Sequence, residues 1–544
     1  MALAREVQSL QARSTAPIAS PASLTESVGL SELQYLCSQL PPKATCDKLV
    51  AVYTTHFEKT LRVIHRPSFH RQYQHFWERS DPQPSSEVIP LLTAVLAAAA
   101  SFDQGIFTPE EFSSREYLTH EATKALRAWA NKIPRKNRVD LATLQVETLT
   151  IIADYLQLTP AEDIWKAIGC LVRSGMMMGL HVDLSRFSKL TFYQTECRRR
   201  LWITILELDL QISILSGMPM MVPELDLGPL TPLNLNDTDF DESTSEPPSP
   251  ANAEEETDSL AQITLATSLA HRIKSMKLAQ SPSSRDSFRE RVEMGQRLEE
   301  YLASIPHQLR PGTQPAGASP ASILSHVLLD IFVRRPLLHL LRPLIPAVTN
   351  TGPDEPLFHA IRRACLDSSL AILSYQDYFD PHYAELDTRD STPYWNFFHS
   401  HCQNDLLWSA LSLCELMRPQ GQALTVPVSP KAAVDQRKSD YHVPSKATLI
   451  RLLEGTLDTF TRQSHLRGSN VKDILLLTTV IQSIRCRVPV GQRQHLMLQG
   501  AKNTMAACRQ NLLSVAAQQP TTGETVGTNH PVSAFLNKTR RGDH

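Results

Sequence analysis

Apolar residues recur along most of this chain with the period of an α-helix. From residue 31 onward they are spaced three and four apart, and runs that alternate Val, Ile or Thr with polar residues are almost absent. The segment after Pro160 carries one such stripe: Ile164, Ile168, Leu171, Val172, Met176 and Leu180. The pattern predicts an all-α protein, built as a large multi-helix bundle or array.

The segment 191–217 is apolar around nearly its whole circumference. Thr191, with Gln194 three residues later, predicts its start, and Gly217 followed by Pro219 predicts its end. Its apolar residues are Leu201, Trp202, Ile203, Ile205, Leu206, Leu208, Leu210, Ile212, Ile214 and Leu215. A helix of this kind is expected at the centre of a protein. We expect it to pack against the helix 161–181, which the sequence Thr159-Pro160-Ala161-Glu162 predicts to open with a capping box.

The remaining pattern divides the chain into five parts. We expect a disordered segment at 1–30, the first half of a helical domain at 31–235, an acidic flexible linker at 236–259, the second half of the domain at 260–515 and a disordered tail at 516–544. The apolar run Leu91–Phe102 is too short to span a bilayer and predicts a buried helix. Helical periodicity continues over 260–303, and further helices are predicted at 323–342, 357–376, 396–417, 446–463, 471–485 and 492–514.

Two carboxylates interrupt the apolar helix 191–217. Glu207 and Asp209 have no basic neighbour one turn away on the same helix. Because a buried carboxylate without a partner costs several kcal/mol, one or both must meet a base or a donor from another helix. Arg334 and Arg335, in the apolar helix 323–342, are the candidates. We expect a buried ion pair that fixes helix register, and a ligand-sensing role is the alternative.

The charge balance argues against nucleic-acid binding by the positive charge of the chain as a whole. The 544 residues contain 54 Lys and Arg against 56 Asp and Glu, a formal net charge of −2. Arg198, Arg199 and Arg200 form a basic run, but successive helical residues point about 100° apart, so the three cannot face one phosphate backbone. The basic segments 134–138 and 538–541 are either solvated charge or nuclear import signals.

Cysteine usage and motif content exclude several function classes. The nine cysteines are scattered without a C-x-x-C pair, so neither a disulfide framework nor a structural zinc site is expected. The usual glycine-rich and nucleophile motifs are missing, and no enzyme is predicted. His65, His70 and His75 do not share a helical face and are expected to be ordinary surface or packing residues. His399 and His401 allow a loop metal site only as a minor alternative. No signal segment opens the chain, so the protein should be soluble and intracellular.

Several segments together resemble the fungal-specific transcription factor domain, or middle homology region, of zinc-cluster regulators. HRPSFHRQY (65–73) resembles its H-x-P-x-F element, GLHVD (179–183) its G-L-H-R-D element, and ECRRRLWITILELDLQISILSGMP (196–219) its E-x-R-R-R-L-W signature. PLNLNDTDFD (232–241) resembles the P-x-N-(I/L)-N-D-x-D element that follows. RRPLLHLLRP (334–343) and DLLWSALSLCEL (405–416) resemble later helices. The residues that fit are His65, Pro67, Phe69, Gly179, Leu180, His181, Asp183, Glu196, Arg198, Arg199, Arg200, Leu201, Trp202, Asp209, Ser213, Gly217, Pro219, Asn234, Asn236 and Asp237.

The resemblance implies a nuclear regulator of RNA polymerase II transcription, and the genes of a metabolic or secondary-metabolite pathway are its expected targets. It also implies a homodimer or heterodimer with related regulators, a helical body that can take a small-molecule effector, and no membrane. Val182, Leu210 and Met218 depart from basic residues that are usual at those positions.

The family's zinc cluster needs six cysteines within a short basic segment, and the N-terminal region offers only Cys37 and Cys46. We therefore expect no zinc or other cofactor in this chain, and DNA contact only through a partner or a missing N-terminal segment. The heptad of Leu3, Val7 and Leu10 is either a chance helix or the coiled coil that often follows the cluster. The alternative function is a helical inhibitor that pairs with full-length zinc-cluster regulators.

Overall fold

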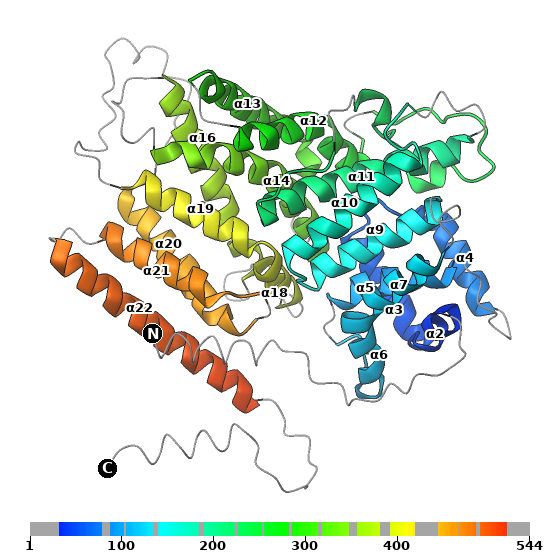
Figure 1. The fold of residues 1–544 in the computed structure, drawn as a ribbon, viewed down its shortest axis with the longest axis horizontal. Helices are drawn as coiled ribbons and strands as arrows, with labels where there is room; N and C mark the ends of the chain where they lie inside the picture. Colours follow the sequence, from blue (N-terminus) through cyan, green and yellow to red (C-terminus); the bar gives the residue numbers. More distant parts are fainter. Residues whose placement is uncertain are drawn as a thin grey trace, which may run out of the picture.

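The computed structural model describes fourteen stretches of the chain, and every regular element in them is a helix (Figure 1). The stretches are 32–78, 88–102, 105–133, 140–183, 190–222, 227–252, 255–281, 285–313, 318–346, 356–380, 392–418, 444–466, 468–485 and 490–518. The predictions for residues 1–30, for the basic segments 134–138 and 538–541 and for residues 519–544 lie outside them. Within the described residues the all-α prediction is confirmed.

The central helix is α11, Phe192–Ser216. The Thr191 side chain accepts from the backbone N–H of Gln194 and the Gln194 side chain accepts in return, and Gly217 ends the helix with a left-handed φ of 69°. Trp202 is fully buried, as are side chains on every side of the helix between 200 and 214. The prediction of a central helix is therefore confirmed.

Helix α10, Ala161–Met177, packs against α11. Its N-cap is Pro160 and no side chain bonds to its first turn, so the predicted capping box at Thr159 is wrong. Gly175 allows the two helices to approach closely, because a Cβ there would lie 2.8 Å from Cζ3 of Trp202. This glycine sets the distance between the two helices.

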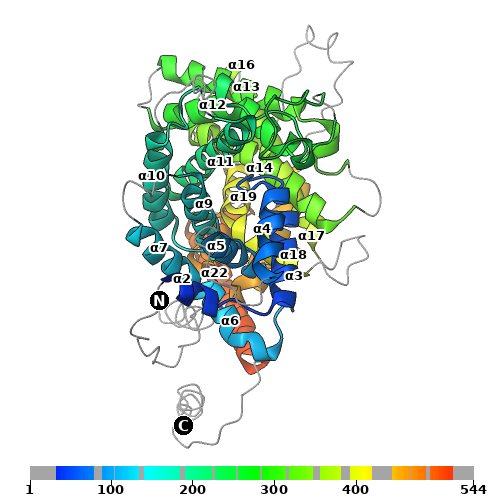
Figure 2. The same cartoon turned by 90° about the vertical axis from the view of Figure 1, so that its right-hand side faces the viewer.

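The N-terminal helices surround the apolar helix α5, Val88–Ala100, which is buried as predicted. The other N-terminal elements are α2 (Glu32–Ser38), α3 (Lys43–His56), α4 (Arg66–Glu78), η1 (Pro109–Glu111), α6 (Phe112–Glu116), η2 (Tyr117–Glu121), α7 (Ala122–Lys132) and α9 (Leu141–Leu156). Helix α5 packs against α2, α3, α7 and α9, so these helices form one packed unit (Figure 2).

From residue 260 onward the helices follow the predicted pattern closely, and two short 3-10 elements precede them. They are η4 (Gly228–Leu230), η5 (Asp237–Asp239), α12 (Leu260–Gln280), α13 (Arg285–Ser304), η6 (His307–Leu309), α14 (Pro320–Leu341), η7 (Arg342–Leu344), α16 (Pro356–Ser374), α17 (Gln376–Phe379), α18 (Thr392–His401), α19 (Gln403–Leu416), α20 (Lys446–Arg462), η10 (Gln463–His465), α21 (Val471–Arg485) and α22 (Val490–Gln518). The periodic stretch 260–303 is two helices. No helix among the described residues is both long enough and apolar enough to cross a membrane.

The two halves of the chain share their hydrophobic core. One cluster of buried residues includes both Leu36 near the start and Leu512 near the end, and α14 lies between the halves with contacts to α3 and α11 as well as α12 and α16. The structure differs from the predicted flexible linker at 236–259. In its described part, Asp237 and Phe240 are buried against the body. The described residues of this region, 231–252 and 255–259, are called the strap below and are thus part of the fold.

Candidate functional site

Charged and polar side chains from three distant segments meet under the strap. The loop before α4, the first turns of α11 and the strap contribute them, and Asp237 lies at their centre. We call this set the Asp237 cluster; it consists of Arg62, His65, Arg66, Glu196, Arg200, Asp237 and Asp258. Four of its members, His65, Glu196, Arg200 and Asp237, are residues on which the family resemblance was based.

Asp237 is bound by three arginines. Its Oδ1 accepts from Arg62 and, at 2.6 Å, from Nη1 of Arg200, while its Oδ2 accepts from the backbone N and Nε of Arg66 at 3.1 and 3.2 Å. Burial alone raises the pKa of Asp237, but Arg62 and Arg200 hold it well below its usual range. The carboxylate is therefore ionised at any physiological pH, and it offsets the buried positive charge around it.

His65 is a packing residue with both ring nitrogens engaged. Nδ1 lies 2.7 Å from Oγ of Ser68, and Nε2 lies 2.8 Å from the carbonyl oxygen of Asp237, which it must meet as a donor. Its ring packs on Phe240 of the strap and on Tyr193 of α11. Burial lowers the pKa of His65, so the neutral form with one N–H fits this place. His65 thus joins α4, α11 and the strap.

Glu196 neutralises the other side of Arg200. Its Oε1 accepts from Nε of Arg200 at 3.2 Å and from the backbone N–H of Leu233 on the strap at 3.1 Å. Arg199 reaches Oε2 of Glu196 only at 3.8 Å, and Arg198 bonds to the carbonyl of Gln194. The side chains of Arg198, Arg199 and Arg200 therefore have different surroundings, as predicted. The three do not share one exposed face of the helix.

The strap is closed on itself by polar contacts between its two ends. The backbone N–H of Asp237 donates to Oδ2 of Asp258 at 3.0 Å, and that of Asp258 donates to Oδ1 of Asn236 at 3.1 Å. Thr257 donates to Oδ1 of Asn234 at 2.6 Å. Asn234, Asn236 and Asp237 of the P-x-N-(I/L)-N-D-x-D element thus hold the strap as a loop while Asp237 anchors it to the body.

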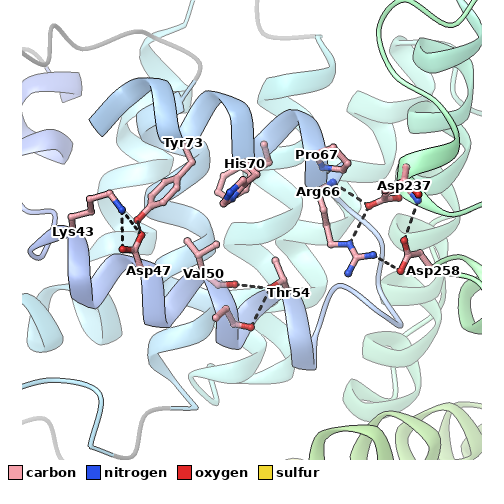
Figure 3. Close-up of a pocket in the computed structure, with 13 residues that line it drawn as sticks. Lys43, Asp47, Val50, Thr54, Arg66, Pro67, His70, Tyr73, Asp237 and Asp258 are labelled. Carbon is pink, nitrogen blue, oxygen red and sulfur yellow. Dashed lines mark hydrogen bonds and ion pairs between the residues drawn. The ribbon is translucent and has the colours of Figure 1, made fainter. Parts of the chain in front are cut away.

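A groove of about 660 Å³ between α3 and α4 ends at this cluster. Figure 3 shows Arg66, Asp237 and Asp258 at one end and the pair Lys43–Asp47 at the other. Apolar and aromatic side chains form its floor, and they include Val50, Phe69 and Tyr73. The volume falls within the range of about 300–1,000 Å³ typical of small-ligand sites.

A second network of charged side chains crosses the core at α11. Its ion pairs differ from the predicted pairing of Glu207 or Asp209 with Arg334 or Arg335. Glu207 is bound by Arg272 of α12, with distances of 2.6 and 2.7 Å, and not by Arg334 or Arg335. Arg335 instead forms a two-bonded pair with Asp405 of α19, at 2.7 and 2.8 Å. Arg334 pairs with Asp330, one turn away in its own helix.

Gln211 connects the two buried pairs. Its amide donates to Oε1 of Glu207 at 2.7 Å and its carbonyl accepts from Nη1 of Arg335 at 2.8 Å. Glu207 and Arg335 therefore belong to one network, but the predicted direct ion pair between them is wrong, because their partners are Arg272 and Asp405. The sequence could not show this, because both partners lie more than 60 residues from the groups they neutralise.

Asp209 has no cationic partner among the described residues. Its Oδ2 accepts from the backbone N–H of Met221 at 3.1 Å, and it lies fully buried beside Ser213. Burial raises its pKa to about 6. The prediction that one or both buried acids meet a base or a donor from another helix is confirmed for Glu207 by Arg272, whereas Asp209 accepts from a backbone donor just beyond its own helix.

The other motif residues shape turns and packing. Gly179 adopts a φ of 80° after α10, Leu180 is buried, and His181 and Asp183 lie half-buried beyond it. The carbonyl of Pro219 accepts from Trp165 at 2.8 Å, and Ser213 lies 3.5 Å from the same oxygen. Pro67, Phe69, Leu201 and Trp202 are packed in the helical body to different depths.

The histidines offer no metal site within the described part of the chain, where no group of three or more His, Cys, Asp or Glu residues is placed to hold an ion. His401 has its ring nitrogens 3.0 and 3.1 Å from the carbonyls of Phe397 and Leu156. His399 is buried against Trp395, and burial lowers its pKa to about 3. The loop metal site considered for this pair is therefore wrong, because both residues belong to helix α18 and its packing.

Comparisons with known proteins agree on one family. A sequence profile of the fungal specific transcription factor domain matches residues 50–301. The transcription factor opdR of Penicillium oxalicum (strain 114-2) is 31% identical over 349 residues, which are 63% of this chain and 43% of the relative. The equisetin cluster transcription factor eqxF of Fusarium heterosporum is 28% identical over 368 residues, 63% and 49% of the two chains.

A third relative, the Zn(2)-C6 fungal-type transcription factor mpsB of Macrophomina phaseolina, is 27% identical over 347 residues, 63% of this chain and 46% of the relative. The chain thus spans less than half the length of these relatives. No solved structure matches it. The profile covers the Asp237 cluster and both central helices, α10 and α11.

Proposed function

Residues 50–301 are a fungal specific transcription factor domain, and we propose that this chain regulates RNA polymerase II transcription in the nucleus. One observation carries the proposal: four motif residues of the matched domain, spread over positions 65 to 237, meet in the single buried Asp237 cluster. The similar proteins are named as transcription factors, one of them of a metabolite gene cluster. A metabolic or secondary-metabolite pathway is the corresponding proposal for the target genes.

The helical body is proposed to act by binding other proteins, not by catalysis. The matched family and the similar proteins are transcription factors, which are not enzymes. Dimerisation with itself or with a related regulator belongs to this proposal. DNA contact is proposed to come from that partner or from a segment beyond this sequence, because the net charge of −2 gives the chain no overall positive field.

A tethering assay tests this function. The chain is fused to an unrelated DNA-binding module in a fungal cell that carries a reporter gene with the matching site. We expect the fusion to change reporter transcription at least several-fold and to collect in the nucleus when fluorescently tagged. An Asp237→Asn fusion should lose most of the effect, whereas Glu242→Gln, on the exposed face of the strap, should keep it. An inert fusion at normal abundance would contradict the proposal.

The same assay separates the second candidate, a helical inhibitor of full-length regulators. An inhibitor leaves the tethered reporter unchanged but lowers the activity of a co-expressed zinc-cluster regulator with which it co-purifies.

We propose the α3–α4 groove as the place where a small-molecule effector acts. A ligand there would touch Arg66 and Asp258, which connect α4 to the strap. Thermal melting of the purified chain with metabolite extracts tests this, with Tyr73→Ala and Val50→Glu as variants that alter the floor. A melting shift that both variants abolish supports the groove.

A further inference from the structure

A small cavity lies where helix α18 meets the turn between α20 and α21. His399 and Gln403 line it on one side, and Phe460, Gln463 and Ser469 line it on the other. Its volume is about 10 Å³, which admits one water molecule. A metabolite needs a site of about 300 Å³ or more, so the cavity is too small for one.

Two buried polar atoms of the residues that line this cavity have no hydrogen-bond partner among the described residues. They are Nε2 of His399, a residue that is only 4% exposed, and Oε1 of Gln463. Burial lowers the pKa of His399 to about 3, so its ring is neutral and Nε2 either donates or accepts one hydrogen bond. Buried polar atoms in native proteins are nearly always bonded, to the protein or to ordered water.

The ring of His399 is held in place by aromatic neighbours. Its centroid lies 4.1 Å from that of Trp395, 5.8 Å from that of Phe398 and 6.5 Å from that of Phe460. Turning the ring toward another partner would break these contacts. The bond that Nε2 requires must therefore come from a group inside the cavity.

The same place is a junction between the two halves of the chain. Gly468, in the turn that lines the cavity, has a φ of 89°, and a Cβ there would lie 2.9 Å from Cδ1 of Leu158 and 3.6 Å from the carbonyl oxygen of Ser400. One residue beyond Ser400, Nε2 of His401 lies 3.1 Å from the carbonyl oxygen of Leu156. The corner between α9 and α10, the end of α18 and the turn after α20 thus meet beside the cavity.

We propose that the cavity is a binding site for one internal water molecule, which donates one hydrogen bond to Oε1 of Gln463 and forms a second one with Nε2 of His399. The water joins α18 to η10 and so helps to hold α20 and α21 on the rest of the body. A buried water makes about three hydrogen bonds, and the Gln403 and Ser469 side chains supply further polar groups in the wall. This inference does not depend on the proposed function, because these residues lie outside positions 50–301.

Other occupants fit the cavity less well. A metal ion needs several ligands, and within the described ranges no group of three or more His, Cys, Asp or Glu residues is placed to hold one. An apolar molecule would leave both polar atoms unbonded. A water molecule satisfies both, because it can donate two hydrogen bonds and accept two.

Two measurements on the full chain test the proposal. In a crystal structure we expect an ordered water at about 2.7–3.2 Å from both Nε2 of His399 and Oε1 of Gln463. Magnetic relaxation dispersion of the solvent water counts the waters that a protein holds for long times. We expect the double variant His399→Phe with Gln463→Met, which keeps the size of both side chains but removes both polar atoms, to hold one such water fewer than the parent chain.

A double-mutant cycle measures the coupling that the water provides. We expect each single substitution to raise the equilibrium constant of unfolding about fivefold. The double variant should raise it less than about tenfold, whereas independent changes would multiply to about twenty-five-fold. His401→Phe is the matched control, because both ring nitrogens of His401 already face backbone carbonyls. Its effect should multiply with that of Gln463→Met, and it should leave the number of long-lived waters unchanged.

Several results would overturn the proposal. These are an equal number of long-lived waters in the parent chain and the double variant, a direct bond between His399 and Gln463 in the crystal, or a metal ion at the site. Multiplicative effects of His399→Phe and Gln463→Met would also contradict it. If His399→Phe does not fold, Gln463→Met alone decides the matter, because it should still reduce the number of long-lived waters by one.

Discussion

At the scale of single residues, buried charges carry most of the specificity of this fold. Asp237 is placed among three arginines, and Glu207 and Asp405 each hold one arginine through two bonds. Such pairs add little net stability when complete, but removing one member leaves an uncompensated charge in the core. The buried ion pairs therefore determine which segments pack together, and they add little to the free energy of folding.

The first prediction concerns Asp237. Asp237→Asn leaves Arg62 and Arg200 buried without a full counter-charge, and we expect a loss of about 3 kcal/mol in the free energy of unfolding. Urea unfolding followed by circular dichroism measures it. The control is Glu242→Gln, which removes an exposed partner of Arg71 and should cost less than about 1 kcal/mol. If the two substitutions lowered the free energy of unfolding equally, the buried cluster would contribute no more to stability than an exposed ion pair.

The second prediction follows from the pKa of Asp209. Its folded value of about 6 lies above the ordinary value of 3.8, so between these values the folded chain holds a proton that the unfolded chain releases. The associated stability is complete below the ordinary pKa and is lost as the pH rises through 6. We expect the parent chain to lose about 2–3 kcal/mol more than Asp209→Asn between pH 4 and pH 7. Parallel pH profiles of unfolding would contradict this.

At the scale of helices, packing distance depends on small residues at crossings. The α10–α11 contact places the ring of Trp202 over Gly175. The sequence predicted both helices well, because periodicity, the Thr191–Gln194 pair and Gly217 are local signals. It could not predict that Glu207 faces Arg272, since the side of a uniformly apolar helix that meets a given neighbour is decided by tertiary packing.

The third prediction tests this crossing. In Gly175→Ala the new methyl would lie 2.8 Å from the indole of Trp202, so α10 or the ring must move. We expect a loss of about 1–3 kcal/mol in the free energy of unfolding. Gly455→Ala in α20 is the control, because nothing lies within 4 Å of the added Cβ there, and it should gain up to about 1 kcal/mol. Chemical denaturation of both variants measures the free energy of unfolding. A stabilised Gly175→Ala would contradict the close contact of α10 and α11 at Gly175.

At the scale of the whole molecule, each half of the chain has buried charges that residues outside that half neutralise. Arg62 and Arg200 of the first half are neutralised by Asp237 of the strap, and Glu207 is neutralised by Arg272 of the second half. The sequence suggested a free linker at 236–259 because its composition is acidic and rich in Pro and Ser. Composition averages over a segment, and it cannot show that a single aspartate of that segment is the counter-charge of a buried cluster.

The fourth prediction follows from this dependence. A fragment of residues 31–235 keeps α11 but loses Asp237 and Arg272, so it should lack a cooperative unfolding transition in circular dichroism and thermal scans. Co-expression with residues 236–544 should restore one. A sharp transition in the isolated fragment would show that the first half is an independent domain.

The distance along the chain between Arg62 and Asp237, 175 residues, also has a consequence during synthesis. At about 5–20 residues per second, the ribosome needs roughly ten seconds or more to deliver the aspartate after the arginine has emerged. For most of that interval Arg62 lacks its counter-charge, and near its end the apolar helix α11 emerges before the carboxylate that binds both Arg62 and Arg200. Newly made chains are therefore expected to need chaperones until the strap emerges, and codons that slow translation before residue 258 should raise the share of aggregated product.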